Sequence, residues 1–332
     1  MPTIFLSFNR SARSNYFGDQ ALAGLQALGE VRLNDSDVAL DGSALIAAAQ
    51  GCQVIVSDRQ TPGRAGLFAS SPELAVFLRC AMDIRNVDVA AASAAGVLVT
   101  HASAGFGNAV AEWVIGVMID LGRGISRSVL AYRSGAQPAA RMGRELRGSS
   151  LGIIGYGHIG RHVGALAQAL GMQVCFSDPA VQASGTAARR LPLDALLAES
   201  DFVLCLAPAT PETENLMGAA RFARMKAGAY FINAARGDLV DETALLHALD
   251  SGHLAGGALD VGRAPDQMPS PELARHPLVI ATPHIGGLTP AAAEHQAQET
   301  VAQLAALLRG GMPAGAVNAE HARRLTTLRR SA

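Results

Sequence analysis

Three things that the sequence lacks narrow the classes of protein it can encode. No stretch reaches the roughly 18 uninterrupted apolar residues of a membrane-spanning helix. The net charge is −1, so no basic excess is available for wrapping nucleic acid. The N-terminal MPTIFLSFNR has neither the charged start nor the long apolar stretch of a secretion signal. We therefore expect a soluble cytoplasmic protein that binds neither a membrane nor nucleic acid.

Cysteine is also scarce, and its spacing excludes a C-x-x-C motif. The four cysteines are Cys52, Cys80, Cys175 and Cys205, and the last two lie inside apolar runs. Buried free thiols in a reducing compartment fit this pattern, and no metal site is predicted. The 332 residues include 49% hydrophobic and 17% charged residues, a globular balance with enough material for two domains.

Short apolar runs alternate with helical patterns along most of the chain, which predicts the α/β class with parallel sheets. The strands expected in the first part are Thr3–Phe8, Val31–Asn34, Val54–Asp58, Val76–Cys80 and Val97–His101. Those of the second part are Leu151–Gly155, Gln173–Asp178, Phe202–Ala207, Tyr230–Ala234, Gly256–Val261 and Val279–Pro283. Helices are expected at Ile159–Leu170, Leu193–Ala198, Glu242–Ser251 and Ala291–Leu308, and a buried or interface helix at Val110–Leu121.

A G-x-G-x-x-G motif follows one of these strands and opens a helix, which is the context that phosphate binding requires. Gly155 permits the tight turn, Gly157 lets the backbone approach a pyrophosphate, and Gly160 lets the helix pack on the strand. The free N–H groups near His158 and Ile159 can then hold the anion. The alternative is a glycine-rich turn without a ligand.

Asp178 ends the next predicted strand, at the distance from the glycines where a ribose-binding carboxylate is expected. A carboxylate there can accept both ribose hydroxyls of an adenosine and repels a 2′-phosphate. It is followed by Pro179 and Ala180 rather than by an arginine, so the sequence favours NAD over NADP. Alternatively, Asp178 is an ordinary turn residue.

Polar residues follow several later strands, at the sheet edge where ligands bind in doubly wound folds. They are Ala207-Pro208, Arg236, Asp260 and His284. Arg236 can bind a substrate carboxylate and carbonyl, and His284 can protonate a forming alkoxide or accept its proton. Asp260 can orient a nicotinamide amide. The alternatives are a structural ion pair for Arg236 and a core or helix-flanking histidine at position 284.

The sequence resembles the D-isomer-specific 2-hydroxyacid dehydrogenase family. The similarity lies in RGSSLGIIGYGHIG, APATPETENLMG, FINAARGDLVDETALLHALDSGHLAGGALDV and ATPHIGGLTP, and more weakly in NVDVAAASAAGVLVTHASAGFGNAVAEWVIG. It implies two doubly wound parallel-sheet domains, with a Rossmann NAD-binding domain (100–287) inserted in a flavodoxin-like substrate domain (1–99 and 288–332). A cleft between them would close over substrate and NAD. Members are usually dimers, paired through the helix that corresponds to Ala109–Leu121.

The resemblance also implies roles for single residues. Arg236 would be the catalytic arginine, His284 the acid/base histidine and Asp260 the nicotinamide-side aspartate. The turn that holds the substrate carboxylate through backbone N–H groups would include Met82 and Asp83. Further cofactor contacts would come from Ala207, Pro208, Ala234, Gly286 and Gly287.

Two departures from the family pattern concern the site. Pro265 stands where the family has the glutamate that pairs with its histidine. The partner of His284 is then Asp266, one residue later, or the more distant Glu272, or His284 pairs with no carboxylate at all. Asp83 stands where glycine is usual. It would repel a substrate carboxylate if it faced the cleft, and Arg85 is a possible compensating charge.

The leading hypothesis is NAD-linked interconversion of a small 2-oxoacid and its D-2-hydroxyacid, with Arg236, His284 and Asp266 in the catalytic set. A second hypothesis is formate-like oxidation, which needs no proton transfer and so tolerates the loss of the glutamate. A third is a non-catalytic protein that senses NAD. The predicted assembly is a homodimer.

Overall fold

The computed structural model describes residues 1–182 and 187–330, without the side chains of residues 266, 329 and 330. The chain forms two compact units. Unit 1 comprises Met1–Phe106 and Thr289–Ala332, and unit 2 comprises Gly107–Leu288. The functional domain boundaries at 99/100 and 287/288 remain predictions.

Unit 1 is built on a five-stranded parallel sheet of order β2-β1-β3-β4-β5, which is the flavodoxin-like order. The central strands β3 and β4 are buried along their whole length, because helices cover both faces and each strand is an apolar run up to its last residue. The strands are β1 Thr3–Leu6, β2 Glu30–Leu33, β3 Val54–Ser57, β4 Val76–Arg79 and β5 Leu98–His101.

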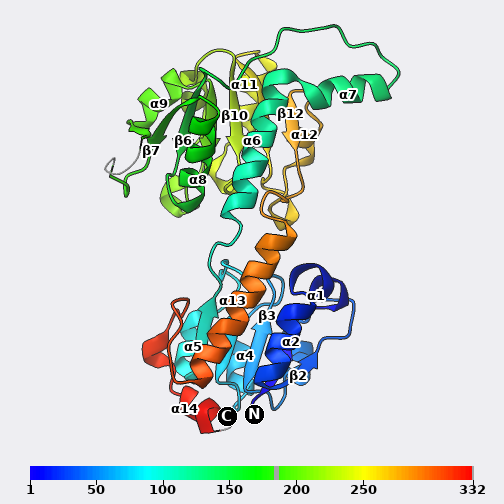
Figure 1. The fold of residues 1–332 in the computed structure, drawn as a ribbon, viewed down its shortest axis with the longest axis vertical. Coiled ribbons are helices and arrows are strands. Elements are labelled where there is room, and N and C mark those ends of the chain that lie inside the picture. The colour runs from blue at the N-terminus through cyan, green and yellow to red at the C-terminus, as the bar shows by residue number, and fades with distance from the viewer. Residues whose placement is uncertain (183–186, 331–332) are drawn as a thin grey trace. The chain divides into compact units, whose positions relative to one another are not determined.

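The long C-terminal helix α13 completes the core of unit 1 (Figure 1). Its Ala297, Leu304 and Leu307 are fully buried among side chains of the sheet. Thr289 caps its first turn by accepting from the Ala292 N–H, and proline occupies the first helical position. The helices of unit 1 are α1 Arg10–Tyr16, α2 Asp19–Leu28, α3 Gly42–Ala48, α4 Ala65–Ser70, α5 Val89–Ala95, α13 Pro290–Leu308 and α14 Leu325–Arg330, with the turn η4 Ala319–His321.

Unit 2 is built on a seven-stranded parallel sheet of order β12-β11-β10-β9-β6-β7-β8. Counted from β6, this is the Rossmann order with one added edge strand, and it reverses between β6 and β9. All eleven predicted strands are present, which confirms the predicted fold class; the two-residue, exposed β8 is an addition. The strands are β6 Ser150–Ile154, β7 Gln173–Ser177, β8 Arg189–Arg190, β9 Phe202–Cys205, β10 Ala229–Asn233, β11 Leu254–Leu259 and β12 Val279–Ala281.

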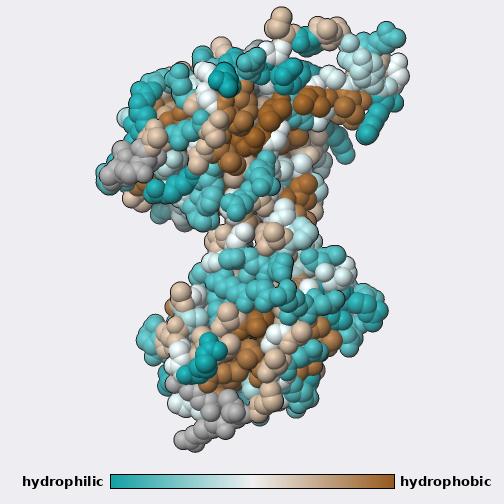
Figure 2. All heavy atoms as spheres, viewed as in Figure 1, coloured by the Kyte–Doolittle hydropathy of each residue, from teal (hydrophilic) through white to brown (hydrophobic). Residues whose placement is uncertain are grey.

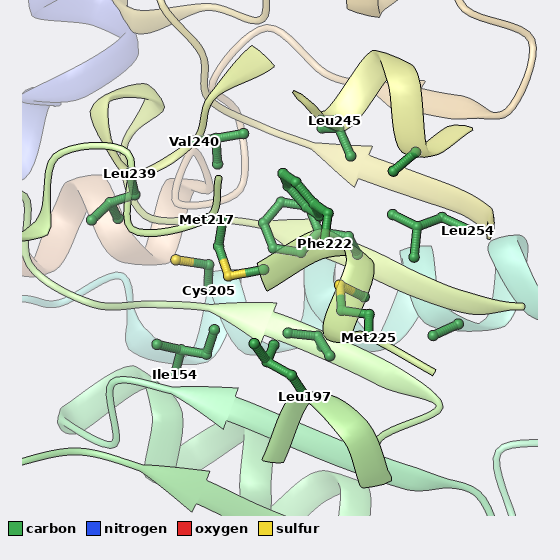
Figure 3. Close-up of a cluster of buried hydrophobic side chains, with 14 of the residues drawn as sticks. Ile154, Leu197, Cys205, Met217, Phe222, Met225, Leu239, Val240, Leu245 and Leu254 are labelled. Carbon is green, nitrogen blue, oxygen red and sulfur yellow. The ribbon is translucent and has the colours of Figure 1, made fainter. Parts of the chain in front are cut away.

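Helices α9, α10 and α11 cover one face of this sheet, where Ile154, Leu197, Phe222 and Met225 meet in a continuous apolar cluster (Figure 3). Helix α6 packs on α8 and β11, whereas α7 has no buried residue. No helix within the described ranges is long and apolar enough to cross a membrane. The helices and turns of unit 2 are α6 Gly107–Arg123, α7 Ile125–Arg133, α8 His158–Ala169, α9 Leu193–Glu199, η1 Pro211–Thr213, α10 Ala219–Arg224, η2 Gly237–Leu239, α11 Glu242–Asp250, η3 Pro265–Gln267 and α12 Pro271–Arg275.

The four cysteines are buried free thiols, as the sequence predicts. Burial raises the pKa of the Cys80 and Cys205 thiols to about 12. Neither thiol is therefore a nucleophile at neutral pH, because the reactive species is the thiolate.

Candidate active site

The carboxyl ends of six strands of unit 2 form one continuous rim. The strand register pairs the last residue of each strand directly with that of its neighbour, in the order Ser177, Ile154, Cys205, Asn233, Leu259 and Ala281. The segments that leave these strands must therefore emerge side by side. They contain every candidate site residue of the second half of the chain.

The glycine-rich turn leaves β6 at the point where the strand order reverses. Gly155 has φ +89°, and a Cβ built on it would lie 2.7 Å from the Leu206 and Ala207 backbone. A Cβ on Gly160 would lie 2.7 Å from the Gly155 carbonyl oxygen. A Cβ on Gly157, by contrast, would meet nothing within 4 Å. Internal packing therefore requires the outer two glycines, whereas the middle one, the N-cap residue of α8, borders open space.

This asymmetry fits a dinucleotide. Open space beside an N-cap without a side-chain cap is what a pyrophosphate needs in order to reach the first N–H groups of α8. His158 begins α8 with an exposed side chain, Ile159 is half-buried, and the His158 ring lies 4.4 Å from the His162 ring.

Asp178 follows β7 and reaches back to the glycine turn. One carboxylate oxygen accepts from the Tyr156 N–H at 2.8 Å and the other from the Ala180 N–H at 2.8 Å. Each oxygen keeps capacity for a second hydrogen bond, so the side chain both fixes the turn and can accept ribose hydroxyls. The Tyr156 ring stacks on Phe176 at 4.2 Å, a packing contact that sequence reasoning missed.

Ala207-Pro208 and Ala234 line the same rim beyond β9 and β10. Ala207 is buried beside Gly155, and Pro208 is exposed. Ala234 is half-buried, and its N–H donates to the Cys205 carbonyl. Ala207 thus brings a small, uncharged side chain next to the glycine turn, and Ala234 follows β10, which is separated from β6 by β9.

Arg236 is presented by a loop that a buried asparagine holds. The amide of Asn233, 1% exposed, donates to the Arg236 carbonyl at 2.9 Å and accepts from the Ala235 N–H at 3.1 Å. Arg236 is half-buried, and its guanidinium donates to the Ala235 carbonyl at 2.6 Å. The sequence gives no signal for this role of Asn233, because an asparagine at the end of a strand resembles any turn residue.

Asp260 anchors the loop that carries His284. Its carboxylate, 4% exposed, accepts from the Thr282 hydroxyl at 2.6 Å, the Ile285 N–H at 2.8 Å and the Gly286 N–H at 2.7 Å. These donors occupy three of about four acceptor positions of a carboxylate. Asp260 thus brackets His284 on both sides.

The backbone of His284 is left-handed, with φ 56°, and its N–H donates to the Thr282 carbonyl at 2.9 Å. Such a conformation costs roughly 1–3 kcal/mol outside glycine and persists only where the surroundings impose it. Beyond it, Gly286 is buried against the Asp260 carboxylate, and Gly287 is half-buried. The loop therefore stores backbone strain at the residue that carries the imidazole.

Which carboxylate pairs with His284 stays the open question that the sequence raises. Pro265 lies in η3 on a tight loop in which the Gly262 N–H donates to the Gln267 carbonyl at 2.9 Å. The Asp266 side chain lies outside the described part of the structure. Glu272 is exposed on α12.

In unit 1, the turn after β4 carries the other predicted substrate residues. Met82 is 43% exposed. Both Asp83 oxygens accept from the Arg85 guanidinium at 2.7–3.1 Å, and one also accepts from the Arg85 N–H. Arg85 thus offsets the charge of Asp83, the compensation that the sequence left open.

Comparison with known proteins places this arrangement among dehydrogenases. The family model described as "D-isomer specific 2-hydroxyacid dehydrogenase, NAD binding domain" matches residues 115–286. D-3-phosphoglycerate dehydrogenase 2 of Saccharomyces cerevisiae is 40% identical over 247 residues, which cover 70% of this chain and 53% of that protein. D-3-phosphoglycerate dehydrogenase of Haemophilus influenzae is 35% identical over 305 residues, which cover 90% and 74%.

Among solved structures, D-2-hydroxyisocaproate dehydrogenase superposes with a TM-score of 0.85 at 23% identity, covering 95% of this chain and 99% of that one. At this identity the likeness concerns the fold. The chain spans about half the length of the yeast and mammalian relatives that it matches.

Proposed function

The chain belongs to the D-isomer-specific 2-hydroxyacid dehydrogenase family, with NAD as its cofactor, and we propose that it interconverts a small 2-oxoacid and the D-2-hydroxyacid. The relatives named above are D-3-phosphoglycerate dehydrogenases, so D-3-phosphoglycerate, itself a 2-hydroxyacid, is the first substrate to test.

The residues that would hold NAD lie along the rim of unit 2. The open N-terminus of α8 at Gly157 would hold the pyrophosphate, and Asp178 the adenosine ribose. Ala207-Pro208, Ala234 and the loop anchored by Asp260 would border the rest of the cofactor. When bound, the nicotinamide supplies or accepts the hydride.

The chain's own side chains supply the remaining chemistry. The planar donors of Arg236 suit a carboxylate and a neighbouring keto oxygen, and they stabilise negative charge that develops on that oxygen. The His284 imidazole donates a proton to this oxygen during reduction and takes it back during oxidation.

The observation that carries the proposal is the strained turn at His284. A core or helix-flanking histidine has no need of a left-handed backbone held by three hydrogen bonds to one buried carboxylate. Strain of this kind concentrates at functional sites. It favours an imidazole that must point in one fixed direction, as a proton donor does.

The test follows NADH absorbance with glyoxylate, hydroxypyruvate, pyruvate and phenylpyruvate, and NAD reduction with D-3-phosphoglycerate and formate. Arg236→Ala and His284→Ala should each lower kcat/KM by about a hundredfold or more without changing NADH affinity. Arg224→Ala and His321→Ala, which remove an exposed arginine and an exposed histidine, should leave turnover unchanged.

Turnover of formate but of no hydroxyacid would refute the proposal in favour of formate-like oxidation. Pro265, in place of the family's glutamate, would then fit a reaction that needs no proton transfer. Tight NADH binding with no turnover of any acid would refute the proposal and leave an NAD sensor.

We also propose that the protein is a homodimer joined through α7. This helix exposes Leu130 and Tyr132 by 65% and 66%, and Figure 2 shows apolar residues gathered along it. Helix α6, the sequence-predicted contact, turns most of its apolar face inward, whereas α7 has none of its residues buried.

Between α6 and α7 lies a hollow of about 440 Å³, lined by Ile119, Arg123, Ile125, Ser128, Val129 and Tyr132. A second copy of α7 is the occupant that suits this surface, because equivalent patches meet in a twofold dimer.

Leu130→Asp should convert the dimer to a monomer in analytical ultracentrifugation, since it places a charge in the apolar contact. Val38→Asp changes an equally exposed side chain in unit 1 and should leave the dimer intact. A monomeric wild-type protein, or a dimer unaffected by Leu130→Asp, would refute the α7 contact.

A further inference from the structure

The largest fully buried side chain in the described part of the molecule is a charged one, Arg79. It ends β4 after the apolar residues Val76-Phe-Leu and is 0% exposed. Burial lowers the pKa of its guanidinium to about 10, so it is still a cation at neutral pH. A buried cation destabilises a core unless its partners are well arranged.

The partners of Arg79 belong to two different loops. One terminal nitrogen donates to the Thr61 carbonyl at 3.0 Å and to the Asn86 side-chain oxygen at 2.6 Å. Thr61 lies in the loop after β3, and Asn86 lies in the loop after β4. Within the described residues, the buried Nε and the other terminal nitrogen of Arg79 have no hydrogen-bond partner. A side chain kept for stability alone would not leave two buried donors unmatched.

Asn86 extends the link between the loops. Its side-chain nitrogen donates to the Arg59 carbonyl at 3.0 Å, and its backbone carbonyl accepts from the Gly63 N–H at 3.1 Å. The Gly63 carbonyl in turn accepts from the Asp88 N–H at 2.7 Å. Arg79 therefore lies beneath a network that fastens the loop after β3 to both ends of residues 80–88.

We propose that Arg79 is a positioning residue of the substrate site: its buried guanidinium fixes the 80–86 turn whose backbone N–H groups hold the substrate carboxylate. The inference rests on the proposed function, because it assumes that Met82 and Asp83 contact the substrate. The proposed role of Arg79 also has an electrostatic part. Arg79 interacts electrostatically with Asp58 and Asp83. Together with Arg85, which forms an ion pair with Asp83, it offsets the negative charge that would repel a substrate carboxylate.

Arg79→Lys tests the geometry while retaining the charge, because an ammonium cannot reproduce the planar donor array. KM for the oxoacid should rise about tenfold, with kcat within about threefold and NADH affinity unchanged, because ground-state binding is what the turn provides. Arg64→Lys is the matched control. Arg64 is an exposed arginine of the same unit, paired with Asp41 at 2.7 Å, and its replacement should leave KM unchanged.

Asn86→Asp keeps an oxygen that accepts from Arg79 and removes the nitrogen that donates to the Arg59 carbonyl. This variant is the test if Arg79→Lys does not fold, and it should also raise KM. The increase in KM of the double variant should be smaller than the product of the two single increases, because both residues act through one network.

An unchanged KM in either soluble variant, with a lowered melting temperature only, would overturn the positioning role and leave the proposed function standing. A wild-type protein that binds NADH but turns over no acid would overturn both. An increase in the Kd for NADH equal to that in KM would also refute the inference, because it would place the effect in unit 2.

Discussion

Replacing Asp260 by asparagine tests whether its carboxylate holds His284 in place. One Asp260 oxygen accepts from Thr282 and Ile285 and the other from Gly286, so three donors converge on one side chain. Asparagine has a single oxygen. If it takes the place of the first oxygen, its NH₂ group faces the Gly286 N–H, and two donors oppose each other.

The cost follows from this geometry. A hydrogen bond to a charged group contributes about 1.5–3 kcal/mol, and the buried Gly286 N–H left without an acceptor costs about 1–3 kcal/mol. We expect Asp260→Asn to lose about 3 kcal/mol of unfolding free energy. For a unit of this size, that loss lowers the melting temperature by about 6–12 °C.

Activity should fall with the same loop. The bonds to Asp260 offset the strain at His284, so without them the imidazole leaves its productive orientation for much of the time. A loss of about 3 kcal/mol corresponds to roughly a hundredfold lower kcat/KM. Thr282→Val removes one of the three bonds and leaves both backbone donors paired, so we expect a smaller loss, about tenfold.

The assay combines calorimetry of the protein without cofactor, NADH titration and steady-state kinetics. An Asp260→Asn protein with wild-type melting temperature and kcat/KM would refute the anchoring argument. A normal melting temperature with weakened NADH binding would instead assign Asp260 to the nicotinamide, the role that the sequence suggests.

Four further substitutions test unit 2. Gly155→Ala should lose more than about 2 kcal/mol of stability by chemical denaturation, because its Cβ meets backbone at 2.7 Å and φ is +89°. Gly157→Ala should leave stability unchanged and weaken NADH binding about tenfold in a fluorescence titration, since its Cβ enters the ligand's space; equal effects of the two substitutions would contradict this division. Asp178→Ala should raise the affinity for NADPH relative to NADH about tenfold, and unchanged selectivity would remove Asp178 from the ribose site. Burial tends to raise the pKa of Asp201, but donors led by Lys226 outweigh it and lower that pKa to about 2. Asp201 therefore stabilises the fold above about pH 4 and loses this contribution between about pH 4 and 2. Asp201→Asn should cost about 2 kcal/mol at pH 7 and nothing below pH 2, and a difference that persists at low pH would exclude the ionic explanation.

The sequence predicted the sheets well because buried parallel strands are short, continuous apolar runs. Strand ends were less certain, since an apolar side chain continues the pattern after the backbone has left the sheet. The apolar pattern, for example, extends the first strand to Phe8, whereas the strand ends at Leu6. The glycine motif could be recognised in the sequence because the packing of the turn requires two of its glycines, with or without a ligand.

Other parts of the site depend on tertiary contacts that leave no local signal. Nothing in the sequence around Asp83 shows that Arg85 turns back to pair with it. The left-handed backbone of His284 is held by Asp260, which follows a different strand. In the sequence, Arg79 resembles any polar residue at the end of a strand. Its burial leaves no local signal, because part of the structure that covers it comes from the loop after β3.

The return of α13 to unit 1 affects how the protein is made. The sheet of unit 1 is complete once residue 101 has been synthesised, but Ala297, Leu304 and Leu307, which close its core, follow only after all of unit 2. At about 5–20 residues per second, the ribosome needs roughly 10–40 seconds to translate the intervening stretch of about 180 residues. During that interval the apolar face of the nascent sheet that α13 will cover is open to water, whereas unit 2 is continuous in sequence and can fold as soon as it emerges. Folding in the cell should therefore begin in unit 2, and the residues of unit 1 that are made before it should become stable only after α13 has followed.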